Sequence, residues 1–171
     1  NCFICMCDDA LDVADERDAE LAAGGGDGLL FGIPIVIKDN VDYEGYVTTN
    51  GHSRGYLAQE DATVVERLLD EGAIIIGKTN MSTGADYAYD SYSEAAGETL
   101  NAYNTEYTPA GSSGGSAAAV SLNFAAAGIG TDTNSSLRLP AAVNGVVAFR
   151  TTFGLVDSTG IVKLNGMRDV V

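Results

Sequence analysis

The sequence predicts an α/β fold in which a central sheet is flanked by helices. An apolar strand at 29–37 precedes an amphipathic helix at 61–71 and a second apolar strand at 73–77. This order is typical of a crossover unit that joins two parallel strands. Small apolar residues at 116–123 then predict a short helix, and 125–132 is expected to return as a further strand.

The remaining elements are weaker. Residues 8–21 have the composition of a helix, which the glycines of 24–28 end. Pro34 lies inside the first long strand, so we expect that strand at a sheet edge or with an irregularity. Residues 78–108 indicate little regular structure, and a further strand is expected at 145–150.

Two segments are expected, an acidic helical segment at 1–28 and the main domain at 29–171. The first contains all three cysteines, Cys2, Cys5 and Cys7. A structural zinc site needs four ligands, and the chain has no second cysteine cluster. We therefore expect no metal, and the unpaired thiols weakly favour a reducing compartment.

Charge limits the classes of partner. The chain of 171 residues has 24 acidic and 9 basic side chains, for a net charge of −15. This charge argues against binding to nucleic acid, where Lys and Arg neutralise phosphates, and against anionic membranes. No signal peptide and no apolar run of about 20 residues is visible, so a cytoplasmic location is the default expectation.

Two motif matches fail on structural context. Residues 72–79 (GAIIIGKT) fit the phosphate-binding loop pattern, but their middle residues form the predicted strand instead of a turn. Residues 111–115 (GSSGG) fit the nucleophile elbow, but that serine needs a preceding strand and a later histidine. Pro109 precedes the motif, and the only histidine, His52, lies upstream.

A lysine and two serine-rich turns remain. Lys38 ends the first apolar strand, where a lysine usually extends its charged end to solvent but can instead be buried with a lowered pKa, which would make it a base. The turns at 111–116 and 134–136 each offer hydroxyls and consecutive backbone N–H groups. Since a histidine base is excluded by position, a lysine is the natural activator of a serine in a dry site.

Four spaced motifs resemble the amidase signature family, whose members use a Ser–Ser–Lys triad. The resemblance covers about residues 27–162 and implies the family's fold of one large mixed sheet covered by helices, with no cofactor. The motifs are GIPIVIKDN (32–40), GKTNM (77–81), TPAGSSGGSAAAV (108–120) and GTDTNSSLRLPA (130–141).

The resemblance implies a role for each matching residue. Lys38 stands where the family has its base, Ser112 where it has a bridging serine after a cis peptide bond, and Ser136 where it has the nucleophile. Asp132 and Arg138 match residues that support the turn. The expected oxyanion donors are the backbone N–H groups of Thr133, Asn134, Ser135 and Ser136.

The chain departs from the family in two ways. Asn134 and Ser135 replace two glycines of the family's GTDxGGS turn, which predicts a narrower oxyanion hole and a shifted substrate range. The family's enzymes run to several hundred residues. We therefore expect a partial, truncated member, in which 29–171 is the N-terminal part of an amidase-signature domain and turnover by this chain alone is doubtful.

The function expected from the resemblance is hydrolysis of a carboxamide C–N bond through an acyl-enzyme on Ser136, with Ser112 and Lys38 as proton relay. One alternative is the glutamine-hydrolysing A subunit of glutamyl-tRNA amidotransferase. Another is an inactive remnant that only keeps the fold. The expected partner is a small-molecule or peptide amide substrate, and a homodimer is the assembly considered.

Overall fold

A computed structural model describes all residues, 1–171. Its helices are α1 (Ala10–Ala22), α2 (Thr63–Asp70), α3 (Gly114–Ser121) and α4 (Arg138–Val143), with one 3₁₀ turn, η1 (Thr83–Ala85). Its strands are β1 (Phe3–Met6), β2 (Pro34–Lys38), β3 (Val47–Thr48), β4 (Tyr56–Leu57), β5 (Ile74–Thr79), β6 (Tyr92–Ser93), β7 (Gly97–Glu98) and β8 (Ala127–Ile129).

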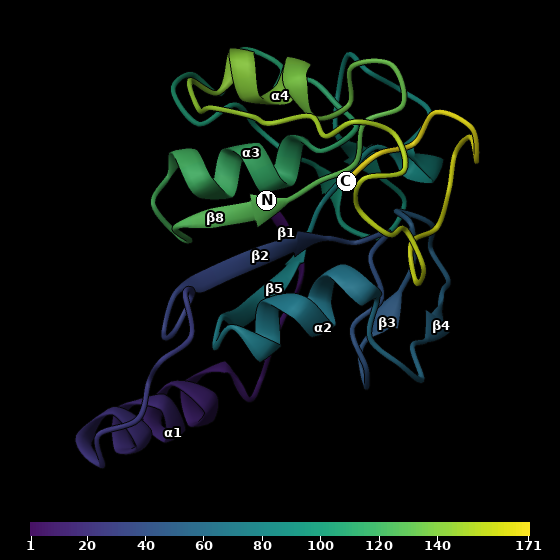
Figure 1. Cartoon of the computed structure of the whole chain (residues 1–171). Helices are drawn as coiled ribbons and strands as arrows, with labels where there is room; N and C mark the ends of the chain where they lie inside the picture. The colour runs from purple at the N-terminus through teal and green to yellow at the C-terminus, as the bar shows by residue number, and fades with distance from the viewer.

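The central sheet has four strands in the order β1–β5–β2–β8. β2 pairs in parallel with both β5 and β8, while β1 runs antiparallel to β5. The sheet is therefore mixed, as the resemblance implies. Helices α3 and α4 lie on one side of it and α2 on the other (Figure 1). β3–β4 and β6–β7 form two separate two-stranded sheets.

Side chains that alternate along β2 fill two different cores. Ile35 and Ile37 face α2 and pack with Val65. Val36 faces α3 and packs with Ala118 and other small residues. Because successive side chains of a strand point to opposite faces, Lys38 lies on the same side as Val36, toward α3.

The predicted crossover unit, β2–α2–β5, is confirmed. For the strand that contains Pro34, the sequence predicts an edge position or an irregularity. The edge position is wrong, because β2 is an interior strand, but its pairing with β5 does shift register between Ile35 and Val36. Pro34 is the first residue of the strand, and its carbonyl accepts from the N–H of Ala126 at 3.0 Å. Proline has no N–H to donate to the neighbouring strand, and the first position of a strand tolerates this loss better than an interior position.

Two expectations about strands are wrong. Residues 145–150 do not form a strand, because no partner strand runs beside them and Val147 and Phe149 are 99% and 78% exposed. Conversely, no strand is expected at 3–6, yet β1 joins the central sheet through β5. Its four residues are too short a run to show the alternation that marks a strand in a sequence.

The phosphate-loop pattern lies in β5, as its sequence context indicates. Lys78 is fully buried on the α2 side of the sheet, where its Nζ donates to Thr48 Oγ1 at 2.7 Å and lies 3.6 Å from Asp39 Oδ1. Its neighbours Gly77 and Thr79 are strand residues. A lysine held in this way has no access to a phosphate.

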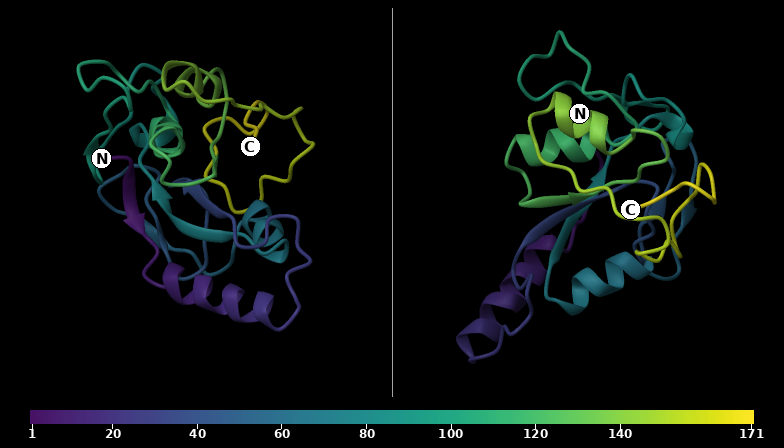
Figure 2. Two further views of the ribbon diagram at one scale, coloured as in Figure 1. Left: turned by 90° about the vertical axis from the view of Figure 1, so that its left-hand side faces the viewer. Right: turned by 45° about the horizontal axis from the view of Figure 1, so that its top comes forward.

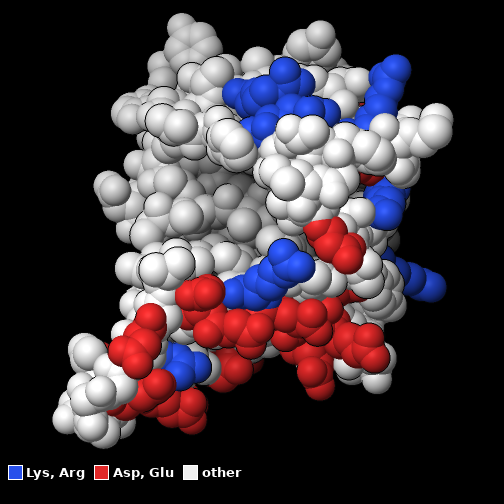
Figure 3. Space-filling model, in the orientation of Figure 1, with Lys and Arg blue, Asp and Glu red and all other residues white.

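Charge is unevenly distributed over the surface (Figure 3). Acidic side chains gather over α1 and α2, and the largest group of basic side chains lies near α4. Helix α1 extends away from the layer that contains α3 and α4, as Figure 2 shows. None of the helices combines the length and the apolar character that crossing a bilayer requires.

Helix α3 lies close to the sheet because its first residues are glycines. A Cβ on Gly115 would come within 2.3 Å of the carbonyl oxygen of Asn80 and 2.6 Å of the Asn80 nitrogen. These are backbone atoms, which cannot rotate out of the way. The glycine therefore determines how closely the N-terminus of α3, and the turn before it, approaches β5.

We predict that Gly115→Ala destabilises the chain, because the added methyl overpacks this contact. Urea unfolding should show a loss of about 1–3 kcal/mol in the free energy of unfolding. Gly166→Ala is the matched control, since a Cβ there meets no atom within 4 Å. Equal stability of the two variants would contradict this account of the helix contact.

Candidate active site

Lys38 ends β2 with a fully buried side chain. Its Nζ lies 2.7 Å from Ser112 Oγ and 2.8 Å from Thr131 Oγ1. Ser112 precedes α3, and Thr131 follows β8. Residues separated by 74 and 93 positions in the chain thus meet at one nitrogen atom. The parallel strands β2 and β8 bring them together, because their carboxyl ends lie at the same edge of the sheet.

Burial changes the chemistry of this lysine. It lowers the pKa of Lys38 to about 7, because the charged ammonium loses its hydration, while the carboxylates of Asp132 and Asp169 act in the opposite direction. A group with this pKa is partly neutral at physiological pH. Lys38 can therefore accept a proton, which an ordinary lysine rarely can.

Ser112 is held rigidly at the start of the helix layer. The peptide bond between Gly111 and Ser112 is cis, as the resemblance implies. The carbonyl of Ser112 accepts from the N–H of Ser82 at 3.2 Å, and the side chain is fully buried. Its hydroxyl is hydrogen-bonded to Lys38 Nζ.

Ser136 belongs to the second turn and lies close to the first. Its carbonyl accepts from the N–H of Ser113 at 3.0 Å, and only 7% of the residue is exposed. Ser113 Oγ also donates to the carbonyl of Thr131 at 3.2 Å. The two serine turns are thus joined through Ser113.

The second turn presents unused backbone donors. The four residues expected to form an oxyanion hole are Thr133, Asn134, Ser135 and Ser136, and none of their backbone N–H groups donates a hydrogen bond within the chain. The next two N–H groups, of Leu137 and Arg138, both donate to the carboxylate of Asp132. Consecutive free N–H groups beside a buried hydroxyl can stabilise a developing negative charge.

The replacement of two glycines does not strain the turn. Neither Asn134 nor Ser135 is among the residues with positive φ, so neither position requires the backbone conformation that favours glycine. Asn134 is exposed, and its side-chain oxygen accepts from Arg168 Nη1 at 3.4 Å. Any effect of the replacement must therefore come from the added side chains and not from the backbone conformation.

Asp132 organises the base of this turn. Its buried carboxylate accepts two bonds from Arg138, Nε to Oδ2 at 3.0 Å and Nη2 to Oδ1 at 3.1 Å. Arg150 Nε donates to Oδ1 at 3.2 Å. Burial alone would raise the pKa of Asp132, but the bonds from Arg138 and from the backbone N–H groups of Leu137 and Arg138 outweigh it and lower the pKa.

Sequence reasoning missed four residues that hold the site. Asp169 accepts from Thr133 Oγ1 at 2.5 Å and from two N–H groups of the C-terminal segment. Arg150 and Asp169 have no local signal, since their contacts are long-range. Thr131 and Asn40 do lie inside the quoted motifs. Their position could have indicated them, because each is a polar residue within two positions of Asp132 or Lys38.

The other reactive side chains lie elsewhere. The three cysteines are free, and burial raises the pKa of Cys7 to about 12. No group of three or more His, Cys, Asp or Glu side chains is placed to hold a metal ion. His52 is half exposed and lies 3.8 Å from Glu94.

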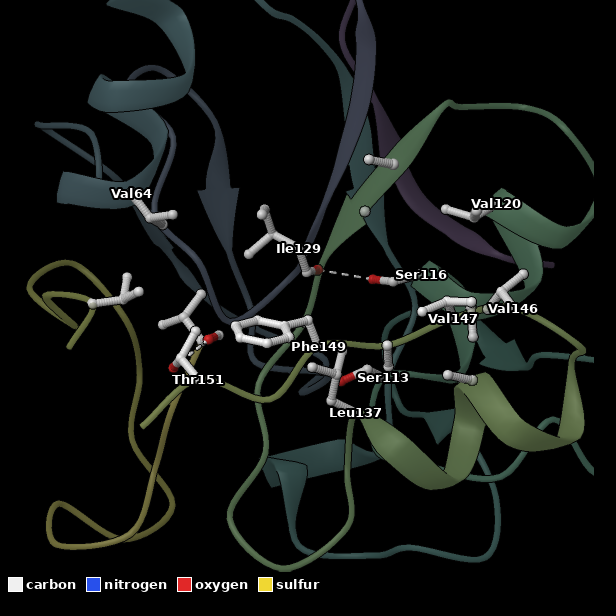
Figure 4. Close-up of a pocket in the computed structure, with 18 of the residues that line it drawn as sticks. Val64, Ser113, Ser116, Val120, Ile129, Leu137, Val146, Val147, Phe149 and Thr151 are labelled. Carbon is white, nitrogen blue, oxygen red and sulfur yellow. Dashed lines mark hydrogen bonds between the residues drawn. The ribbon is translucent and has the colours of Figure 1, made fainter. Parts of the chain in front are cut away.

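A cavity lies beside the site. It has a volume of about 380 Å³ and is lined mainly by apolar residues of α3, β8 and 146–149. Ser113 and Leu137, neighbours of the two key serines, contribute to its wall, and Ser116 Oγ donates to the carbonyl of Ile129 within it (Figure 4). Lys38, Ser112 and Ser136 do not line it.

We predict that Asp132→Asn destabilises the chain, because an amide replaces the carboxylate that binds two arginines. Bonds to a charged group contribute about 1.5–3 kcal/mol, so a loss of this size is expected in urea unfolding. Asp12→Asn, at an exposed position of α1, is the control and should change little. A stable Asp132→Asn variant would show that the turn does not depend on this carboxylate.

The sequence of the whole chain, residues 1–171, matches the family model described as Amidase. It is 43% identical to the A subunit of glutamyl-tRNA(Gln) amidotransferase from Methanococcoides burtonii, over 95% of this chain and 34% of that protein. The corresponding protein of Acidothermus cellulolyticus is also 43% identical, over 95% of this chain and 32% of its own length. The chain spans about a third of the length of these curated relatives.

Solved structures agree in fold. The native peptide amidase from Stenotrophomonas maltophilia matches with a TM-score of 0.92 and 41% identity, over 98% of this chain and 36% of that one. An amidase family protein from Bacillus anthracis matches with a TM-score of 0.89 and 38% identity, over 94% and 34% of the two chains. Together with the match over its full length, these similarities show that the chain belongs to the amidase signature family.

Proposed function

We propose that this site cleaves the C–N bond of a carboxamide through an acyl-enzyme on Ser136. The observation that carries the proposal is the buried contact of 2.7 Å between Lys38 Nζ and Ser112 Oγ. A lysine whose pKa is lowered to about 7 is an effective base near neutral pH. The free N–H groups of 133–136 supply the second requirement, a site for the oxyanion.

The proposed reaction begins with neutral Lys38. Lys38 takes a proton from Ser112 as Ser112 takes one from Ser136, and Ser136 Oγ attacks the amide carbonyl. The carbonyl oxygen becomes an oxyanion that the turn's N–H groups stabilise. The relay then returns the proton to the leaving amine or ammonia, and water releases the acyl group by the same relay in reverse.

The transfer between Ser112 and Ser136 needs their hydroxyls to approach one another. The hydrogen bond from Ser113 N–H to the carbonyl of Ser136 supports this step, because it joins the two turns that carry the serines. Catalytic hydrogen bonds often shorten only when substrate is bound. Asp132 and Arg138, in this proposal, support the turn and do not react.

Hydrolysis of glutamine is a second candidate function, because curated relatives at 43% identity are named as the A subunit of glutamyl-tRNA(Gln) amidotransferase. The peptide amidase similarity favours a peptide amide substrate instead. Ammonia release from glutamine and from a panel of peptide and small-molecule amides distinguishes the two. Activity on glutamine that requires copurified partner proteins would favour the second candidate.

Two expectations from the sequence remain predictions. They are the division of the chain into segments 1–28 and 29–171, and a homodimeric assembly.

We predict that a fluorophosphonate probe labels Ser136, because the probe reacts with an activated serine and needs only part of a substrate pocket. Mapping of the labelled peptide should identify Ser136 and not Ser135. Lys38→Ala should slow labelling by roughly 10²-fold or more, the usual contribution of a general base. Lys163→Ala, at an exposed position, is the control. Labelling that survives Lys38→Ala would rule out the relay, and absence of any labelling would favour an inactive remnant.

The rate of labelling should depend on pH with a midpoint near the Lys38 pKa of about 7. Below this pH Lys38 is protonated and cannot accept a proton, so the rate should fall as the pH falls. Above it the rate should reach a plateau. A rate that does not change through neutral pH would be inconsistent with Lys38 as the base.

A further inference from the structure

Lys38 has a second hydroxyl partner that the proposed relay does not use. Thr131 Oγ1 lies 2.8 Å from Lys38 Nζ, almost as close as Ser112 Oγ at 2.7 Å. Thr131 is 6% exposed and Lys38 is fully buried, so water does not compete freely for either group. The lysine nitrogen is thus held by two hydroxyls from two different turns.

Thr131 is itself fixed from three directions. Asn40 Nδ2 donates to the same oxygen, Thr131 Oγ1, at 3.3 Å. Ser113 Oγ donates to the Thr131 carbonyl at 3.2 Å and accepts from its N–H at 3.3 Å. The amide of Asn40 is anchored in turn to the carbonyl of Val162 at 3.1 Å. The hydroxyl oxygen of Thr131 therefore has little freedom to move.

The direction of the Lys38 lone pair decides whether it can act as a base. A neutral amine has two N–H donors and one lone pair, and a hydroxyl oxygen has two acceptor sites. Asn40 Nδ2, which can only donate, occupies one acceptor site of Thr131. When the other site accepts an N–H from Lys38, the amine is oriented with its lone pair free to receive the Ser112 proton.

We propose that Thr131 is a positioning residue whose hydroxyl oxygen holds Lys38 Nζ in line with Ser112 Oγ. This inference rests on the proposed function, because it gives Thr131 a role in the same relay. Thr131 touches neither the substrate nor Ser136 in this proposal; it acts only through Lys38. Asn40 supports it by filling the competing acceptor site.

The hydroxyl also stabilises the protonated lysine, so its removal should lower the pKa of Lys38 further. The other charges that act on Lys38 are the carboxylates of Asp132 and Asp169. Lys78 and Asp39 form their ion pair on the opposite side of the sheet from Lys38. None of these groups changes when the Thr131 hydroxyl is removed, so the shift reports that hydroxyl.

The first experiment measures the Lys38 pKa directly in the whole chain by NMR of lysine labelled at Cε. The chain has three lysines, so the signals are few and can be assigned by Lys→Arg variants. Thr131→Val should lower the Lys38 pKa by roughly one unit, because a hydrogen bond to a charged group is lost. Thr131→Ser, which keeps the hydroxyl, should restore the wild-type value.

Thr79→Val is the matched control. Thr79 is an equally buried threonine and the strand neighbour of Lys38, but its hydroxyl bonds to Ser116 and to the carbonyl of Ile37. It should leave the Lys38 pKa unchanged even if it lowers stability. If Thr131→Val does not fold, Thr131→Ala removes the same hydroxyl without adding a methyl group at its position. An unchanged Lys38 pKa in the folded variant overturns the proposal.

The second experiment compares the pH dependence of fluorophosphonate labelling. Thr131→Val should lower the plateau rate by about tenfold or more while moving the acid limb to lower pH, and Thr131→Ser should recover both. A purely structural role would lower the rate without moving the limb, and that result overturns the proposal. If Lys38→Ala leaves labelling intact, the proposed function fails, whereas the NMR result on Thr131 still tests the contact itself.

Discussion

Parallel pairing of β2 with its neighbours is the constraint on which the site depends. Ile37 is in register with Ile129 of β8 and with Lys78 of β5. The next residue of β2 is Lys38, and the chain after β8 turns at once into Gly130 and Thr131. Parallel strands end at the same edge of a sheet, so this register places the lysine beside the turn that contains Ser136. A register shift of one residue would point Lys38 to the α2 side.

Close packing of α3 on the sheet completes the arrangement. Gly115 lies against the backbone of Asn80, and a Cβ on Gly128 of β8 would come within 3.4 Å of Val120 and 3.5 Å of Ser116 of α3. Small residues at these contacts bring the helix, and Ser112 before it, within reach of a lysine at the strand end. Larger side chains would fill the same volume but would move the helix away. The many alanines and glycines of 111–128 are therefore part of the geometry of the site.

The sheet contains two buried lysines that differ in their surroundings. Lys78, on the α2 side, lies 3.6 Å from Asp39 and donates to Thr48 and to the carbonyl of Val47. Lys38, on the α3 side, contacts only hydroxyls and has no carboxylate within bonding distance. Burial lowers the pKa of both lysines, but at Lys78 the neighbouring Asp39 carboxylate opposes this effect, whereas only uncharged hydroxyls contact Lys38. The same residue type thus has a carboxylate partner on one face and hydroxyl partners on the other.

The sequence by itself determined the α/β class and the crossover unit, because hydrophobic periodicity encodes them, and the resemblance to the family singled out Lys38 and Ser112, whose side chains the structure brings into contact. Tertiary structure decided the rest. Pro34 starts an interior strand, residues 145–150 find no partner strand, and β1 joins the sheet although its run is too short to signal a strand. The contacts of Thr131, Asn40, Arg150 and Asp169 join distant segments of the chain. Such contacts depend on which strands lie side by side, and no local pattern of residues specifies that order.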